Sequence, residues 1–244
     1  MVAFLPDDPS WRDVVGSGSM TTTLMTYAGP GEPDALITRT GGTPLAPPGA
    51  VWPNCATCGG PMQFLAQILL DDLSRPVGGG TQAGHVMAIF MCQNDPGMCD
   101  EWSPTAGGNR ALLYPADALQ PMAAPEPDEE EDEEDEDEDV LRLGAVNAVT
   151  LVPAPSADYF SAREEWGNRS GNSLRNVLGQ LGGQPGWLQG DETPACSTCT
   201  QPMSLVAQLE EGPDHATAMN FGGCGTAFAF ACGPCTQAAF LWQC

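Results

Sequence analysis

The sequence predicts an α+β fold in which antiparallel sheet dominates, built as an internal duplication of two similar lobes that each hold four cysteines. The first observation behind this prediction is a repeat, because residues 40–68 align without a gap on residues 181–209 at a constant offset of 141. The second is that each copy has a Cys-x-x-Cys pair followed by a short apolar run between turn residues, which is typical of a strand. The third is that another cysteine pair follows a later apolar run in each copy.

The repeat covers turn residues, cysteines and apolar positions. The identical pairs are Gly41/Gly182, Gly42/Gly183, Pro44/Pro185, Pro53/Pro194, Cys55/Cys196, Cys58/Cys199, Pro61/Pro202, Met62/Met203, Ala66/Ala207 and Gln67/Gln208. Self-similarity at a fixed period takes precedence over the interpretation of single residues. It divides the chain into a first repeat at 1–122, a linker at 123–139 and a second repeat at 140–244.

Each copy is expected to contain two strands in the same order. A Gly-Gly-x-Pro turn leads into the cysteine pair, and an apolar run follows at 62–70 in the first copy and at 203–209 in the second. A second run follows a loop, at 86–91 and at 226–231. Phe228 and Phe230 alternate along the last of these runs, which predicts one buried face.

Two helical segments are expected in the second copy. Residues 156–167 resemble a capped amphipathic helix with Ser156 or Ser161 at its N-cap. Residues 173–181 are expected to form a short helix that ends at the glycines 182 and 183.

The charge of the chain restricts its partners. The chain has eight Lys and Arg residues, all of them Arg, against 32 Asp and Glu, so its net charge is −24. Nucleic acid and acidic lipid are therefore not expected as partners, because both require a basic surface. The chain starts without a basic residue before its apolar stretch and contains no run of about 20 apolar residues, so we expect a cytoplasmic protein.

Twelve consecutive carboxylates at 128–139 separate the two copies. Such a run repels itself and has nothing apolar to bury, so the sequence predicts a disordered acidic linker. It is either an inert solvated spacer or a contact for a basic partner.

The cysteine spacing predicts two structural zinc ions in zinc-ribbon-like sites of four cysteines each. Two cysteines separated by two residues span one edge of a tetrahedron, and a second pair from a later strand closes the opposite edge. The predicted ligands are Cys55, Cys58, Cys92 and Cys99 in the first site and Cys196, Cys199, Cys232 and Cys235 in the second. The alternative is that these are reduced, buried thiols that act as small core residues.

Catalysis is not expected. Cys232-Gly-Pro-Cys235 matches the thioredoxin tetrapeptide, which keeps a thiol oxidoreductase as an alternative, but only nine residues follow it. Neither His85 nor His215 begins the His-x-Glu motif of zinc deaminases. Cys224 and Cys244 have no counterpart in the first copy and no nearby base, so neither is expected to be a nucleophile.

The two copies together resemble the YwqG-like family, a bacterial domain of unknown function. The resemblance is carried by Gly41-Gly-Thr-Pro44, Trp52-Pro53, Pro61-Met-Gln-Phe-Leu-Ala-Gln67, Gly182-Gly-Gln-Pro-Gly-Trp-Leu-Gln189, Pro202-Met203, Gln208 and Phe240-Leu-Trp-Gln-Cys244. The cysteine-bearing halves are also similar to the programmed cell death protein 2 family. The first resemblance implies an immunity protein of a toxin system, and the second implies a chaperone for a basic ribosomal protein. Many bacterial members lack the cysteines, so the metal sites depend on spacing alone.

The sequence therefore predicts a non-enzymatic, zinc-stabilised protein-binding module, with a chaperone-like role toward a protein partner that is basic. The alternatives are an immunity protein that neutralises a polymorphic toxin and a thiol oxidoreductase that uses the Cys-Gly-Pro-Cys pair. The oligomeric state is not determined by these patterns.

Overall fold

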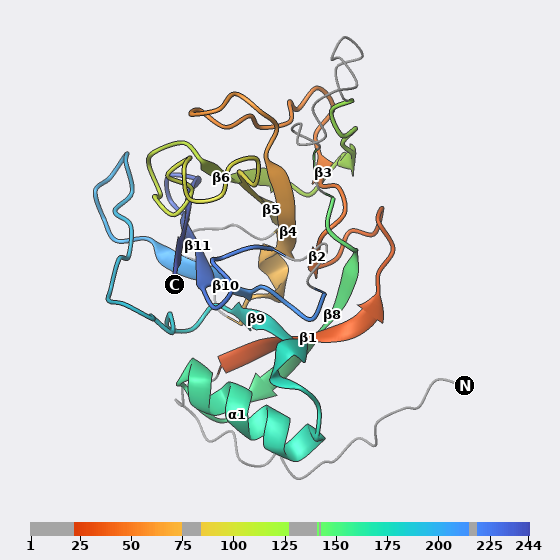
Figure 1. Cartoon of the computed structure of the whole chain (residues 1–244), viewed down its shortest axis with the longest axis vertical. Coiled ribbons are helices and arrows are strands. Elements are labelled where there is room, and N and C mark those ends of the chain that lie inside the picture. Colours follow the sequence, from red (N-terminus) through yellow and green to blue (C-terminus); the bar gives the residue numbers. More distant parts are fainter. Residues whose placement is uncertain (1–21, 75–83, 127–140, 142, 215–218) are drawn as a thin grey trace.

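The computed structural model describes residues 22–74, 84–126, 141, 143–214 and 219–244 (Figure 1). Its main feature is a ten-stranded antiparallel sheet with the strand order β12-β11-β10-β9-β1-β8-β2-β4-β5-β6. The two end strands, β12 and β6, contact each other, so the sheet is nearly closed. A second sheet contains only β3 and β7. The predicted dominance of antiparallel sheet is therefore confirmed.

The strands of the first half of the chain, residues 22–126, are β1 (Thr22–Pro30), β2 (Arg39–Thr40), β3 (Leu45–Ala46), β4 (Gln63–Leu69), β5 (His85–Met91), β6 (Asn109–Pro115) and β7 (Gln120–Pro121). Those of the second half, residues 141–244, are β8 (Asn147–Ala154), β9 (Val177–Leu181), β10 (Ser204–Glu210), β11 (Thr226–Cys232) and β12 (Gln237–Gln243). The helical elements are η2 (Leu70–Asp72), α1 (Tyr159–Ser170) and η4 (Leu174–Asn176). The four apolar runs expected as strands are β4, β5, β10 and β11.

The first strand of each half lies in the sheet of the other half. β1 pairs with β8 and β9, both from the second half, whereas β8 pairs with β1 and with β2 from the first half. The remaining order is the same on both sides of this central pair, with β9-β10-β11-β12 on one side and β2-β4-β5-β6 on the other. The two halves are therefore interleaved in one continuous sheet.

The curled sheet surrounds a core to which both halves contribute. Leu65 and Met87 come from the first half, and Val206 and Phe240 come from the second. Outside the sheet, each half has a smaller apolar cluster that includes cysteines. The strands that separate these cores are consequently buried on both faces.

β11 shows why the expectation of one buried face was incomplete. Phe228 and Phe230 do share a face, on the outer cluster. The alanines that alternate with them, Ala227 and Ala229, face the inner core. All seven residues of β11 are buried, because apolar clusters cover the strand on both sides.

The helical predictions were partly wrong. The helix runs from Tyr159 to Ser170, and its N-cap is Asp158 rather than Ser156 or Ser161. The Asp158 carboxylate accepts a 2.8 Å hydrogen bond from the Ser161 N–H, and this bond lowers the pKa of Asp158. A carboxylate at this position is favoured by the free N–H groups of the first turn.

The second predicted helix, at 173–181, is also wrong. Only the 3-10 turn η4 is helical, and Val177–Leu181 forms β9. Pairing with both β1 and β10 overrides the local preference, because a helix this short is marginal without tertiary support.

Part of the predicted linker lies outside the described residues, as does His215. Residues 123–126 are described, whereas the acidic run at 128–139 is not. Among the residues that the structure describes, none of the helices combines the length and apolar character needed to cross a membrane.

Candidate metal centres

The first four-cysteine cluster forms at one end of the β4–β5 hairpin. Cys55 and Cys58 precede β4, and Cys92 follows β5. Because the two strands are antiparallel and Gln63 pairs with Met91, these cysteines meet at the same end. The next loop returns Cys99 to them, so that all four sulfurs lie within 4.8 Å of one another.

The second cluster is built in the same way at the β10–β11 hairpin. Cys196 and Cys199 precede β10, and Cys232 is the last residue of β11. Ser204 pairs with Ala231, which brings the two ends together. Cys235 follows in the tight turn to β12, and these four sulfurs also lie within 4.8 Å of one another.

The sulfur spacing fits a tetrahedral metal ion. Zinc–sulfur bonds of about 2.3 Å place two ligands of a tetrahedron about 3.8 Å apart. Cys58 Sγ and Cys92 Sγ are separated by 3.7 Å, and so are Cys199 Sγ and Cys232 Sγ. A disulfide requires about 2.05 Å, and the ten cysteines of the chain are free thiols. Both clusters therefore have the donor set and the spacing to hold a metal ion.

Backbone N–H groups point at the first sulfur of each Cys-x-x-Cys pair. The Thr57 N–H donates to Cys55 Sγ at 3.4 Å. In the second cluster, hydrogen bonds from the backbone N–H groups of Cys199 and Thr198 lower the pKa of Cys196 to about 6. These donors stabilise the thiolate, which is the form that ligates a metal.

The neighbouring thiols resist ionisation. Burial raises the pKa of Cys92 to about 12. The pKa of Cys235 is also raised to about 12, and the largest cause is a hydrogen bond between its thiol and Cys199, followed by burial. Four thiolates this close repel one another, and a dication offsets that repulsion, so metal binding releases protons.

In each of the four cysteine pairs, the residue directly after the second cysteine has a positive φ, which is unusual for residues other than glycine. Gly59 follows Cys58 and has a φ of 79°. Asp100, Thr200 and Thr236 follow Cys99, Cys199 and Cys235, with φ values of 51°, 61° and 51°. A β-branched residue in this left-handed region is strained and persists only where its surroundings impose the conformation. The left-handed conformation recurs at the position where each chain segment turns around the cluster, and it is strained at the two threonines.

This strain gives a first prediction. Thr200→Gly and Thr236→Gly should each raise the free energy of unfolding by about 1 kcal/mol, because glycine adopts positive φ without steric cost. Chemical denaturation of the metal-loaded protein measures the change. Thr198→Gly, in the same turn but without positive φ, is the matched control and should instead lower stability by about 0.5–1 kcal/mol. The strain interpretation fails if Thr200→Gly and Thr198→Gly have the same sign.

The repeated non-cysteine residues hold the same local contacts in both halves. The Gly41 N–H donates to Leu65 O, and the Gly182 N–H donates to Val206 O, each at 2.8 Å. The Gln67 side chain accepts the Leu45 N–H at 3.1 Å, and Gln208 accepts the Gly186 N–H at 2.9 Å. These contacts position the turn that leads into each cysteine pair.

The remaining candidates lie apart from the clusters. Cys224 and Cys244 are exposed and belong to neither group of four. His85 opens β5 and is half-buried. Cys232 and Cys235 are followed by strand β12, whereas a redox Cys-x-x-Cys uses a helix N-terminus to stabilise its thiolate.

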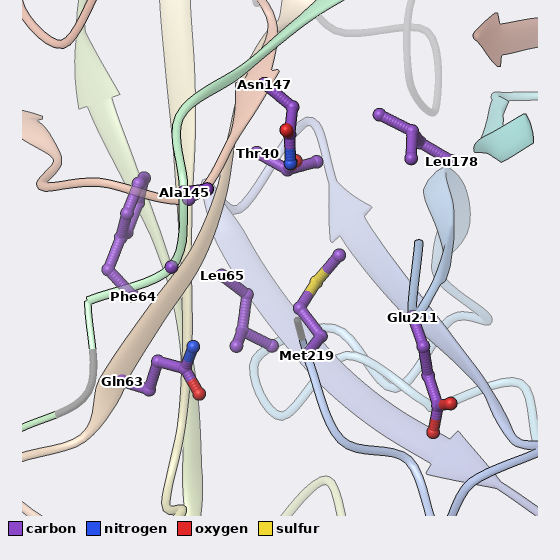
Figure 2. Close-up of a pocket in the computed structure, with 11 residues that line it drawn as sticks. Thr40, Gln63, Phe64, Leu65, Ala145, Asn147, Leu178, Glu211 and Met219 are labelled. Atoms are coloured by element: carbon purple, nitrogen blue, oxygen red, sulfur yellow. The ribbon is translucent and has the colours of Figure 1, made fainter. Parts of the chain in front are cut away.

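A small cavity lies at the seam between the halves and was not foreseen. Figure 2 shows Thr40, Leu65 and Asn147 on one side, and Leu178, Glu211 and Met219 on the other. Its volume of about 20 Å³ accommodates a single water molecule. The cavity is therefore too small for an organic substrate.

A second, open hollow of about 240 Å³ lies beside Trp52. It is lined by Ala46, Pro47, Gly49, Ala50, Trp52, Gln120, Pro121, Met122 and Ala123. Its lining includes no cysteine, histidine or charged side chain, so it has no group suited to acid–base or nucleophilic chemistry.

Comparison with known proteins gives two matches. The sequence profile of a family described as "Domain of unknown function (DUF1963)" matches residues 38–231. The chain is also 35% identical over 74 residues to an "Uncharacterized protein YpfL" of Salmonella typhimurium, which covers 29% of this chain. The aligned stretch spans only 16% of that relative.

Proposed function

The chain belongs to the DUF1963 family, a bacterial domain of unknown function, and on that premise we propose that it is a non-enzymatic, zinc-stabilised module that binds a basic protein. The observation that carries the proposal is that four sulfurs close each candidate centre. A catalytic zinc site keeps one position open for water or substrate, whereas four protein sulfurs leave none.

Zinc is the proposed ion for three reasons. Tetrahedral sites of four sulfurs suit zinc or iron–sulfur chemistry. The sulfur separations of 3.7 Å match zinc–thiolate bonds. The centres lie at hairpin ends, where one ion would join loop residues to the strands β5 and β11, and a structural zinc ion contributes to folding in this way.

The arrangement of the halves supports the proposed duplication. β4 and β10 differ by 141 in residue number at both ends. The isolated bridges Asn54–Pro61 and Ala195–Pro202 also differ by 141. A resemblance to the YwqG-like and programmed cell death protein 2 families would accord with this repeated unit, and with a binding role that involves no chemistry.

The charge of the chain supports a basic partner. The net charge is −24, and 12 of the 32 carboxylates lie at 128–139. A field of this sign raises the association rate of basic proteins and disfavours acidic ones.

The acidic run provides a direct test of the partner's charge. Replacing 128–139 with a neutral Gly/Ser segment should leave the unfolding free energy unchanged and weaken binding to a basic partner. The loss should be greatest at low salt, because ions screen exposed charges. Affinity capture with the intact chain identifies the partner, and its dissociation constant is then measured at several salt concentrations. An affinity that is unchanged at every salt concentration would reduce the run to a spacer.

The thiol oxidoreductase alternative rests on the Cys232-Gly-Pro-Cys235 tetrapeptide and is tested separately. Zinc analysis together with thiol titration should find two ions and eight protected thiols, with only Cys224 and Cys244 reacting quickly. Rapid reaction of Cys232 and Cys235 in metal-loaded protein would support redox chemistry instead.

A further inference from the structure

We propose that the loop between β5 and β6 binds the basic partner, through Met98 and Trp102 flanked by Asp95 and Asp100. This inference rests on the proposed function and names the surface that performs it. The occupant is a basic segment that also carries an apolar side chain.

The loop that carries the last cysteine of the cluster is much longer in the first half than in the second. β5 ends at Met91 and β6 begins at Asn109, whereas β11 ends at Cys232 and β12 begins at Gln237. The turn at 233–236 brings Cys235 to its cluster in four residues. The longer loop at 92–108 supplies the equivalent ligand, Cys99, so most of its residues are not required for ligation.

This longer loop is held in one conformation by several hydrogen bonds. Within it, the Gly97 N–H donates to Glu101 Oε1 at 2.6 Å. Asn109 Nδ2 donates to the carbonyls of Glu101 at 2.8 Å and Ser103 at 2.9 Å. Its end is joined to the first cysteine pair, where the Ala56 N–H donates to Gly107 O at 3.0 Å. A loop fixed in this way loses little conformational entropy when it binds a partner.

The ordered loop presents two large apolar side chains to solvent. Met98 is 69% exposed and Trp102 is 42% exposed. Trp and Met are enriched at protein interfaces, and Trp often dominates the binding energy. Cys99 lies between them in the sequence and is buried in the cluster, so a metal ion there would anchor the stretch of backbone that carries both side chains.

The charges around this pair favour a basic partner. Asp95 and Asp100 are exposed. A divalent ion bound by four thiolates would add a net charge of about −2, and Cys58 of this centre is also exposed. These negative charges outnumber the positive charge of Arg110. Arg110 lies opposite Phe90 in the sheet and therefore shares its face, on which the cluster with Cys92 and Cys99 also lies. The indole ring of Trp102 can also receive an Arg or Lys side chain on its face.

The test uses chains in which 128–139 is neutral, so that the acidic run does not contribute. The probe is a short fluorescent peptide of alternating Arg and Leu, with an Arg/Ser peptide of the same charge as comparison. In anisotropy titrations, Met98→Ala/Trp102→Ala should weaken binding of the Arg/Leu peptide by about tenfold or more. Phe160→Ala, which removes a 40% exposed aromatic ring from α1, is the matched control and should bind like the parent.

The outcomes separate this inference from the proposed function. If neither the intact chain nor the parent with a neutral run binds either peptide, the proposal of a basic partner fails and this surface fails with it. If only the intact chain binds, the acidic run and not this loop holds the partner. If the double variant binds as well as the parent, or Phe160→Ala loses as much, only the loop assignment is overturned. Sedimentation tests the other occupant: a dimer of the parent that Met98→Ala/Trp102→Ala dissociates would assign this face to a second copy.

The role of the metal in this surface is tested with matched ligand variants. Cys99→Ser should weaken peptide binding by about the same factor as the double variant, whereas Cys235→Ser should not. Circular dichroism checks that the sheet is retained in both, and binding is compared only at temperatures where both variants are folded. Equal binding by Cys99→Ser and the parent would show that metal does not order the loop.

Discussion

Replacing Cys92 by serine is expected to lower the zinc content from two ions per chain to one and to reduce the free energy of unfolding by on the order of 5–10 kcal/mol. Cys92 is 1% exposed and joins β5 to both the four-cysteine cluster and the outer core. Serine is a poor ligand for zinc, so the ion is lost and three thiols remain close together without a cation. Metal analysis and denaturant unfolding under reducing conditions measure the two effects.

Two further variants make this result specific. Cys224→Ser removes an exposed thiol outside both clusters and should change neither quantity. Cys232→Ser should also remove one ion, from the other centre. A parent protein that purifies without metal and is no more stable than Cys92→Ser would overturn the assignment of these cysteines as structural ligands.

Cutting the chain within 128–139 is expected to leave the two halves associated. β1 is hydrogen-bonded between β8 and β9, and β8 is bonded to β2, so separation would expose strands at the centre of the sheet. It would also open an inner core formed by side chains from both halves. A protease site placed in the run, followed by size-exclusion chromatography in native buffer, should give one species at the uncut elution volume.

The cut protein also provides its own control. In denaturant the two pieces should separate, and on dilution of cut protein the melting temperature should depend on concentration, because unfolding is now coupled to dissociation. Two self-contained lobes would instead separate in native buffer as two folded species. That outcome would contradict the interleaved sheet.

The strands and the two groups of four cysteines could be anticipated because their signals are local. The runs at 62–70 and 203–209 lie between turns, and they form β4 and β10. The pairs Cys55/Cys58 and Cys196/Cys199 sit in tight turns that need no distant contact. Cys92 and Cys232 could be grouped with the first pairs because they stand at the end of β5 and β11, the strands that pair with β4 and β10.

The strand at 177–181, the helix cap and the conformation of the loop at 92–108 depend on contacts that a local sequence pattern does not predict. Residues 177–181 form a strand because β1 and β10 lie on either side of them. The helix cap was misplaced because three candidate residues, Ser156, Asp158 and Ser161, compete within one short segment. The rigidity of the loop at 92–108 depends on Asn109 and Gly107, whose side-chain and backbone partners are not predictable from spacing.

By itself, the sequence determined the matching blocks at 40–68 and 181–209, the four main strands and the two sets of four cysteines, because identity at a fixed offset and Cys-x-x-Cys spacing are local signals. Only the tertiary structure decided that β1 and β8 lie in the sheet of the opposite half and that the sheet nearly closes. Sheet pairing joins residues more than 100 positions apart, and many registers satisfy the same local pattern. The core shared by both halves selects one of them.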